Sequence, residues 1–386
     1  MDHHPEVLGD LCDIKSPVSL RQILRLLRND LNDLIRRRIV NQVKRSSPAR
    51  TYLFGILREV LGSNLIALDY EVKVRPRYTP DNPHPLLFTL INANRKQYQK
   101  TLFSFLHFRD PLVQISLDAA LGIADTPRWR NDFLPGLDAV TLYSLMAQTN
   151  PRRYFEIGSG NSTRFARRAI RDQGLRTQIT SVDPNPRDDV DSLCDLCLRT
   201  PLEEVDLSIF RDLQPGDIVF FDGSHRVLTN SDAAVFFLEV FPSLRPGVIV
   251  QIHDIHLPFD YPAEWSNRFY SEQYLLAALI LSKTNSFRVL LPNAFISHDA
   301  QLSAILDPLW NHPSMKRVER YGGSFWITKG PTETRDDSQA QKEASALSWS
   351  RCVDYLEGWR FLLALLSRKA VDRGDLIGQM KHHNGA

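Results

Sequence analysis

Between residues 134 and 330 the chain alternates short apolar runs with stretches whose apolar residues recur at helical spacing. The apolar runs are residues 154–157, 178–182, 217–221, 247–252, 287–291 and 324–327. The helical stretches are residues 139–147, 163–171 and 231–241. Strands that alternate with helices predict βαβ units and a parallel sheet covered on both faces. We therefore expect an α/β fold with a doubly wound, Rossmann-like sheet.

The flanking regions lack this alternation and suggest how the rest of the chain is divided. We predict four parts: a mostly helical N-terminal accessory region (1–128), the sheet domain (129–330), a polar linker (331–346) and a C-terminal helical extension (347–386). A helix in the first part has a basic outer face, which suits a membrane surface, a partner or a solvated face on its own domain. The terminal helices also suit contacts in a homo-oligomer.

Composition narrows the class of protein without naming it. The 386 residues are 43% hydrophobic and 24% charged, as in ordinary folded proteins, and the formal net charge of +2 gives no case for nucleic-acid binding. No apolar run approaches the ~18 residues of a transmembrane helix. Four cysteines and the absence of a charged-then-apolar leader favour a cytoplasmic setting. Cys194 and Cys197 form a C-x-x-C pair that we expect to pack on a short helix.

The most informative motif follows the first apolar run. Its residues are Glu156, Gly158, Ser159, Gly160, Asn161 and Ser162. A strand that enters a Gly-x-Gly turn and then a helix builds a ligand pocket at the carboxyl end of a sheet, because glycine lets the backbone approach a ligand. A nicotinamide-binding turn would have a third glycine where this chain has Thr163, which disfavours an oxidoreductase. The acidic Glu156 suits a ligand with an amino group.

This pattern resembles the class I S-adenosylmethionine-dependent methyltransferases. Their first motif is an acidic residue followed by G-x-G, which Glu156, Gly158 and Gly160 match. The family places an acid after its second strand to bind both ribose hydroxyls, and Asp183, followed by Pro184, matches that position. The resemblance implies S-adenosylmethionine as the cofactor, bound by the residues from Glu156 to Ser162, by Asp183 and Pro184, and by Asp222 after the fourth strand.

Two later segments resemble the metal-dependent O-methyltransferases of the same fold. Asp222-Gly-Ser-His225 and His253-Asp-Ile-His256 each follow an apolar run, and parallel strands bring such ends to one crevice. The resemblance implies that Asp222 and Asp254 bind Mg²⁺ and that His225 is the general base. Oxygen ligands suit Mg²⁺, and histidine titrates in a suitable range. The His-Asp-Ile-His sequence departs from the family, so His253 or His256 as the base, and Fe or Zn as the metal, stay open.

We therefore predict methylation of a hydroxyl on a small molecule or glycan. The alternative is a catalytically silent methyltransferase-fold protein that serves binding or assembly. Simpler roles also remain for the site residues: Asp222 as a helix cap, His225 as a surface residue and Asp254 as a loop-stabilising residue. The aromatic loop after His256 suits stacking on a sugar or ring, or packing beneath a long loop.

Overall fold

The structure, a computed structural model, describes residues 72–118, 126–186, 189–283 and 286–331. The described residues from Arg75 onward belong to one compact unit. The predicted basic helix, the C-terminal extension and nearly all of the polar linker lie outside the described residues. Within the described residues no helix is both long and apolar enough to cross a membrane.

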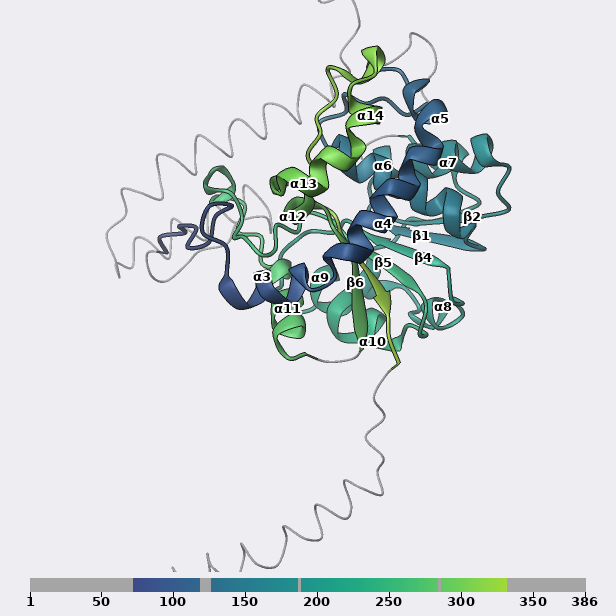
Figure 1. Cartoon of the computed structure of the whole chain (residues 1–386). Helices are drawn as coiled ribbons and strands as arrows, with labels where there is room; N and C mark the ends of the chain where they lie inside the picture. Colours follow the sequence, from purple (N-terminus) through teal and green to yellow (C-terminus); the bar gives the residue numbers. More distant parts are fainter. Residues whose placement is uncertain (1–71, 119–125, 187–188, 284–285, 332–386) are drawn as a thin grey trace, which may run out of the picture. The chain divides into compact units, whose positions relative to one another are not determined.

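A seven-stranded sheet forms the centre of this unit (Figure 1). Its strands are β1 (Arg153–Ile157), β2 (Gln178–Val182), β3 (Leu196–Leu198), β4 (Ile218–Phe221), β5 (Ile249–Ile252), β6 (Phe287–Pro292) and β7 (Phe325–Lys329). The order across the sheet is β3-β2-β1-β4-β5-β7-β6. The first five strands are parallel, and β7 is antiparallel to both of its neighbours.

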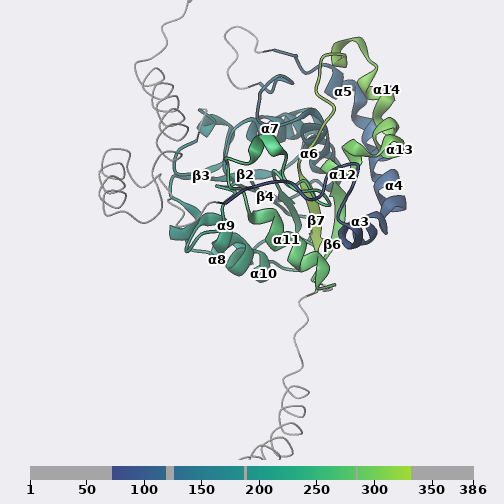
Figure 2. The same ribbon diagram turned by 90° about the vertical axis from the view of Figure 1, so that its left-hand side faces the viewer.

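Helices cover both faces of the sheet, and Figure 2 shows α6 and α7 on one side and α8 to α11 on the other. The α-helices are α3 (Pro85–Asn92), α4 (Arg95–Phe105), α5 (Arg109–Val113), α6 (Gly136–Thr149), α7 (Asn161–Gln173), α8 (Ser208–Arg211), α9 (Asp232–Val235), α10 (Phe241–Ser243), α11 (Glu272–Leu281), α12 (Asn293–His298), α13 (Ala300–Ser303) and α14 (Asp307–Trp310). A π-helical turn, η5 (Phe236–Val240), joins α9 to α10. Short 3₁₀ turns are η2 (Leu106–Phe108), η3 (Asp191–Leu193), η4 (Leu202–Glu204), η6 (Ala263–Trp265), η7 (Ala304–Leu306) and η8 (Pro313–Met315).

The sequence explains why the central strands form where they do. Every residue of β4 and β5 is buried, as expected for parallel strands that are covered on both faces, and all are apolar except Gln251, whose amide donates to the hydroxyl of Ser324 at 2.8 Å. Helix α7 ends at Gly174, which has a left-handed φ of 59° and donates its backbone N–H to Ile170. Gly174 therefore gives the strand-turn-helix unit from β1 to α7 a definite C-terminal end.

Helix α6 is tied to the sheet through a buried carboxylate. Asp138 is 1% exposed and accepts hydrogen bonds from the backbone N–H groups of Gly323 and Ser324 at 2.8 and 2.9 Å. It also accepts one from the side-chain amide of Asn293 at 2.8 Å. These bonds fix the start of α6 against the segment that enters β7, at the edge of the sheet where the parallel strands end.

In the described part of the N-terminal accessory region, residues 72–84 are irregular and the helices α3 to α5 follow, and this region packs on the sheet domain. The guanidinium of Arg95 in α4 makes a two-pronged pair with Asp299, at 2.6 and 2.7 Å. Phe88 of α3 packs edge-on against Phe295 of α12, with ring centroids 5.6 Å apart. The predicted boundary between residues 128 and 129 stays a prediction.

The α/β class is confirmed, and two details of the prediction were wrong. The sheet is mixed rather than parallel throughout, because β7 runs against β5 and β6. Cys197 lies in the short strand β3 and Cys194 in the loop before it, so the pair does not pack on a helix. Leu196 in β3 is 52% exposed, and such a half-exposed three-residue edge strand carries little hydrophobic pattern.

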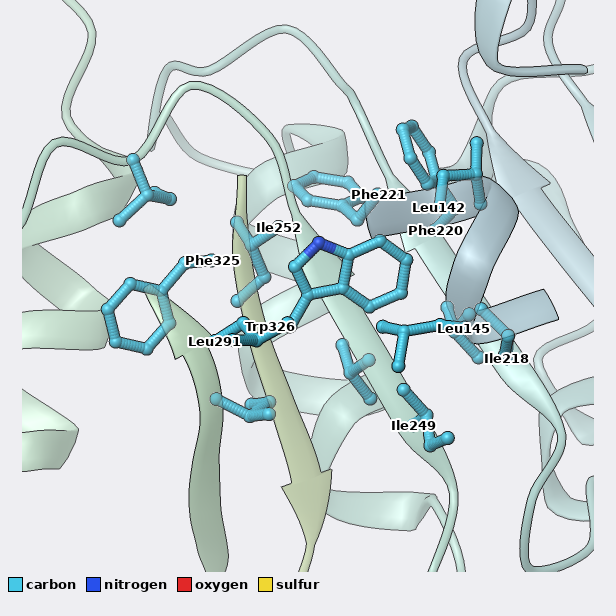
Figure 3. Packing of buried hydrophobic residues seen from close by; sticks show 14 of the residues in the cluster. Leu142, Leu145, Ile218, Phe220, Phe221, Ile249, Ile252, Leu291, Phe325 and Trp326 are labelled. Carbon is cyan, nitrogen blue, oxygen red and sulfur yellow. The ribbon is translucent and has the colours of Figure 1, made fainter. Parts of the chain in front are cut away.

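The core on the α6 side of the sheet is organised around Trp326 of β7 (Figure 3). Its indole is fully buried and meets the ring of Phe220 edge-on, with centroids 6.4 Å apart. Leu145 of α6 and Ile252 of β5 lie nearby in the same cluster. One side chain therefore joins the antiparallel edge, the parallel strands and α6.

Replacing Trp326 by alanine removes this shared contact. We expect Trp326→Ala to lower the free energy of unfolding by about 3–5 kcal/mol, because it leaves a large cavity in a packed core. Denaturant unfolding measures the change. Leu238→Ala is the control, since that side chain is 70% exposed and its loss should cost less than about 0.5 kcal/mol. Equal effects of the two substitutions would contradict the packing argument.

Candidate functional site

The predicted site residues follow the ends of β1, β2, β4 and β5. These strands are parallel, so their carboxyl ends lie at one edge of the sheet. The chain reverses its direction of progress across the sheet between β1 and β4, and in open α/β sheets ligands bind at such a switch point. The site therefore divides into a glycine turn after β1 and a cluster of charged side chains after β4 and β5.

The glycine turn depends on a close approach between two backbones. Gly158 has a φ of +82°, and a Cβ placed on it would lie 2.0 Å from the carbonyl oxygen of Asp222. No larger residue fits there without moving the chain. A Cβ on Gly160 would meet nothing within 4 Å, so this part of the turn has an open side from which a ligand can reach the backbone.

Glu156 lies beneath the turn. It is 0% exposed; one carboxylate oxygen accepts from the hydroxyl of Tyr154 at 3.0 Å, and the other accepts from Thr163. Thr163 in turn accepts the backbone N–H of Gly160 at 3.1 Å, so the residue that replaces a third glycine braces the turn. Burial raises the pKa of Glu156 to about 7. Its predicted contact with the cofactor stays a prediction.

Asp183 faces the same turn from the end of β2. Its Oδ2 accepts the backbone N–H of Ser159 at 2.8 Å, and its Oδ1 accepts that of Asn185 at the same distance. Each oxygen keeps a further lone pair for a ligand hydroxyl. Asn161 and Ser162 are buried in the first turn of α7, and the side-chain oxygen of Asn161 has no hydrogen-bond partner among the described residues.

The second half of the site is a cluster of carboxylates and imidazoles. Nε2 of His225 lies 3.2 Å from Oδ1 of Asp222 and 3.6 Å from Oδ2 of Asp254. Nδ1 of His253 lies 3.6 Å from Oδ1 of Asp222 and 3.3 Å from Oδ1 of Asp254. The predicted residues Asp222, His225 and Asp254 therefore do come together, and both carboxylates face the same ring nitrogens.

Sequence reasoning missed two carboxylates that complete this cluster. Oε1 of Glu272, the first residue of α11, lies 2.6 Å from Nδ1 of His225. Oδ2 of Asp138 in α6 lies 3.6 Å from Nε2 of His253. Each stands at the start of a helix and is distant in sequence from its histidine, so no local motif marks it.

Opposite charges shift the pKa values of these groups strongly. Burial alone would lower the pKa of His225, but the charge of Glu272 and the hydrogen bonds that the ring donates to Asp222 and Glu272 raise it well above its usual value. Burial likewise opposes the charges of Asp222 and Asp254 at His253, whose pKa nevertheless rises to about 10. Burial would raise the pKa values of Asp222 and Asp254, yet the charge of His253 lowers both.

His256 takes a different place from the other two histidines. Its Nδ1 lies 2.9 Å from the hydroxyl of Tyr321, and burial lowers its pKa to about 4. Its ring meets Trp265 edge-on, with centroids 4.9 Å apart. The guanidinium of Arg268 lies over the ring of Trp265, 4.0 Å from the ring centroid. His256 therefore belongs to the aromatic loop rather than to the carboxylate cluster.

Comparisons with known proteins bear on this region. A family model described as a methyltransferase domain matches residues 155–255, which run from β1 to just beyond β5. The comparison with curated proteins finds no match. The methyltransferase MycE from the mycinamycin biosynthetic pathway, solved with Mg, SAH and mycinamycin VI, is 18% identical, with a TM-score of 0.32 over 49% of this chain and 48% of that one. This chain thus matches about half the length of that protein.

Two further solved structures are similar at the same level. The SAH-bound Podospora anserina methyltransferase PaMTH1 is 12% identical, with a TM-score of 0.31 over 50% of this chain and 78% of that one. The O-methyltransferase from Bacillus cereus, in complex with SAH, is 16% identical, with a TM-score of 0.28 over 60% of this chain and 90% of that one.

The buried Glu156 makes stability depend on pH. Its pKa is about 7 in the folded protein against an ordinary value of 4.5, so the folded state holds this proton more tightly than the unfolded chain. The contribution of Glu156 to stability therefore falls as pH rises from about 4.5 to about 7 and is level above that. Glu156→Gln should reduce the loss of unfolding free energy between about pH 5 and pH 8.

Denaturant unfolding at both pH values measures this difference. The control is Glu203→Gln, because Glu203 is exposed and its substitution should leave the pH dependence unchanged. A Glu156→Gln protein with the same pH dependence as the parent would show that Glu156 is ionised throughout this range.

Proposed function

We propose that this chain is a class I S-adenosylmethionine-dependent methyltransferase that transfers a methyl group to a hydroxyl oxygen of a small molecule. The observation that carries the proposal is the placement of His225 and the Asp222 and Asp254 carboxylates beside the glycine turn, at the carboxyl edge of one parallel sheet. The family model supports methyl transfer, and the site residues support oxygen as the atom that receives the methyl group.

The glycine turn and Asp183 would hold the cofactor. The open side of Gly160 leaves its backbone accessible, and the Asp183 carboxylate is fixed against Ser159 with lone pairs free for ribose hydroxyls. The buried residues Asn161 and Ser162 and the neighbouring Pro184 complete the predicted contacts. When bound, S-adenosylmethionine supplies a methyl group on a positively charged sulfur, which leaves as a neutral thioether when oxygen attacks.

In its neutral form, His225 would accept the proton of the acceptor hydroxyl. That form would be favoured by a cation bound to Asp222 and Asp254, which would offset the negative charges that raise the pKa of the ring. Its Nδ1 is taken up by Glu272, so Nε2 is the nitrogen that faces the carboxylates and the reaction space. An alcohol becomes a better nucleophile as its proton moves to a base, and such a step contributes about 10²–10⁴-fold to the rate. In-line attack on the methyl carbon then needs the oxygen to be held in position, which is the main task left to the protein.

Asp222 and Asp254 would hold a divalent cation. Both supply hard carboxylate oxygens, the ligand type that Mg²⁺ prefers, and both lie close to Nε2 of His225, at 3.2 and 3.6 Å. No group of three or more His, Cys, Asp or Glu side chains in the described residues is arranged as a metal site, so water would complete the coordination. A cation there would lower the pKa of the acceptor hydroxyl.

A cavity that is lined by none of the proposed cofactor, metal or base residues has room for a small acceptor. This cavity of about 440 Å³ lies beside Tyr321, and its other walls include Ile296, Leu306 and Trp310. This volume falls in the range of small-molecule pockets, roughly 300–1,000 Å³, and the walls are mostly apolar. Tyr321 also binds His256, which links the cavity to the aromatic loop after β5. Stacking on that loop favours a ring, either of a sugar or of an aromatic alcohol.

The cofactor assignment is tested by replacing Asp183. Loss of two charged hydrogen bonds, each worth at least about 1.5 kcal/mol, should weaken S-adenosylmethionine binding by about 100-fold in Asp183→Ala. Titration calorimetry measures the affinity, and Asp189→Ala provides a control at a nearby exposed carboxylate. Unchanged affinity in Asp183→Ala would remove the ribose contact from the proposal.

The base and the metal are tested separately on turnover. Release of S-adenosylhomocysteine is followed with a panel of dihydroxybenzoates and methyl glycosides as acceptors. We expect His225→Asn to lower kcat by about 100-fold or more while cofactor affinity is kept. We expect a chelator to abolish turnover without affecting cofactor binding, and added Mg²⁺ to restore it.

The outcomes separate the parts of the proposal. Full activity in the presence of chelator would show that the reaction needs no cation, and His225 would remain the proposed base. Full activity of the His225→Asn protein would show that His225 is not the base. Tight cofactor binding with no turnover of any acceptor favours the silent binding or assembly protein instead.

A further inference from the structure

The ring of His225 is held by one short segment, residues 268–272, that immediately precedes and begins α11. Backbone N–H of Ser271 donates to the carbonyl oxygen of His225 at 2.8 Å. The hydroxyl of Ser271 accepts the N–H of Val227 at 2.9 Å. Tyr270 lies over the imidazole, with ring centroids 4.4 Å apart. The backbone of His225, which has a left-handed φ of 62°, is thereby fixed together with its ring.

Glu272 makes the contact that holds the ring of His225 through Nδ1. Its Oε1 lies 2.6 Å from Nδ1 of His225, and its side chain is 0% exposed. An ionised carboxylate only accepts hydrogen bonds, so Nδ1 must donate. The other carboxylate oxygen, Oε2, is buried without a hydrogen-bond partner among the described residues. Burying a carboxylate is costly, and the hydrogen bond with Nδ1 of His225 is the contact that offsets this cost.

The opposite side of the ring faces two further carboxylates. Nε2 lies 3.2 Å from Oδ1 of Asp222 and 3.6 Å from Oδ2 of Asp254. Without Glu272, Nδ1 would lose its carboxylate partner, and the ring could turn toward Asp222 and Asp254. Nε2 would then no longer be held in a fixed direction.

We propose that Glu272 is a positioning residue that holds the ring of His225 through Nδ1 and so directs Nε2 toward the acceptor. This inference rests on the proposed role of His225 as the base. Glu272 acts through His225 and does not touch the acceptor.

The neighbouring residue gives the same segment a second hold on the site. The side-chain oxygen of Gln273 accepts the backbone N–H of His256 at 3.0 Å, and its amide donates to the carbonyl oxygen of Phe259 at 3.4 Å. The start of α11 thus forms hydrogen bonds with the segments that follow both β4 and β5. Glu272 is held rigidly enough to fix a ring orientation.

The test uses Glu272→Gln, which keeps the size of the side chain and removes its charge. Nδ1 then loses its carboxylate partner, so the ring can turn toward Asp222 and Asp254. In the full chain labelled with ¹⁵N-histidine, we expect a solvent-protected Nδ1–H correlation, assigned to His225 by its loss in His225→Asn. This correlation should disappear in Glu272→Gln, while the thermal midpoint and the affinity for S-adenosylmethionine stay unchanged.

Turnover provides the second readout. With the best acceptor from the panel above, kcat should fall by about 100-fold or more in Glu272→Gln with little change in the KM of the acceptor. Glu272→Asp keeps the charge and should recover part of both the correlation and kcat. Glu239→Gln is the matched control, since Glu239 is exposed, and it should behave as the parent.

The two readouts distinguish the two hypotheses. A Glu272→Gln protein that keeps the Nδ1–H correlation, or that keeps full kcat while His225→Asn is inactive, overturns the positioning role. If no acceptor turns over, or if His225→Asn is fully active, the proposed function fails, and the correlation alone decides whether Glu272 fixes the ring.

Discussion

The site depends on how negative charge is balanced at the carboxyl edge of the sheet. The carboxylates of Asp138, Asp222, Asp254 and Glu272 lie around the imidazoles of His225 and His253, and every ring nitrogen of these histidines is within 3.6 Å of a carboxylate oxygen. Carboxylates gathered in a buried place repel each other unless positive charge lies between them. The negative charges of these carboxylates favour the protonated imidazoles and so raise the pKa values of both histidines.

The backbone is bent to bring these groups together. His225 and Asp254 both have left-handed φ values, 62° and 54°, which side-chain-bearing residues adopt only when their surroundings compensate. At His225 the compensation comes from Ser271 and Glu272. Beyond Asp254 it comes from Gly323, whose carbonyl oxygen accepts the N–H of Ile255 at 2.7 Å. The strain and the charge cluster therefore occur at the same residues, as is common where a fold builds a functional site.

The sequence predicts the features of this site that are local. Parallel strands covered on both faces are mostly apolar, with Glu156 in β1 and Gln251 in β5 as buried exceptions. The strand ends before Gly158, Asp222 and Asp254 could therefore be located from the pattern. The direction of β7 could not be predicted, because an antiparallel strand has the same apolar pattern as a parallel one when both of its faces are covered. The short strand β3 was missed because its residues are half exposed.

The contacts that complete the site join residues far apart in the sequence, so the local hydrophobic pattern cannot predict them. Glu272 lies 47 residues from His225, and both Glu272 and Asp138 read in the sequence as ordinary acidic residues in the first turn of a helix. Only packing turns them inward. The same packing ties the loop between His256 and Glu272 to the site, because Gln273, next to Glu272, accepts the backbone N–H of His256 at 3.0 Å and donates to the carbonyl oxygen of Phe259 at 3.4 Å. A change in the length of the loop would therefore also shift the residues that hold His225.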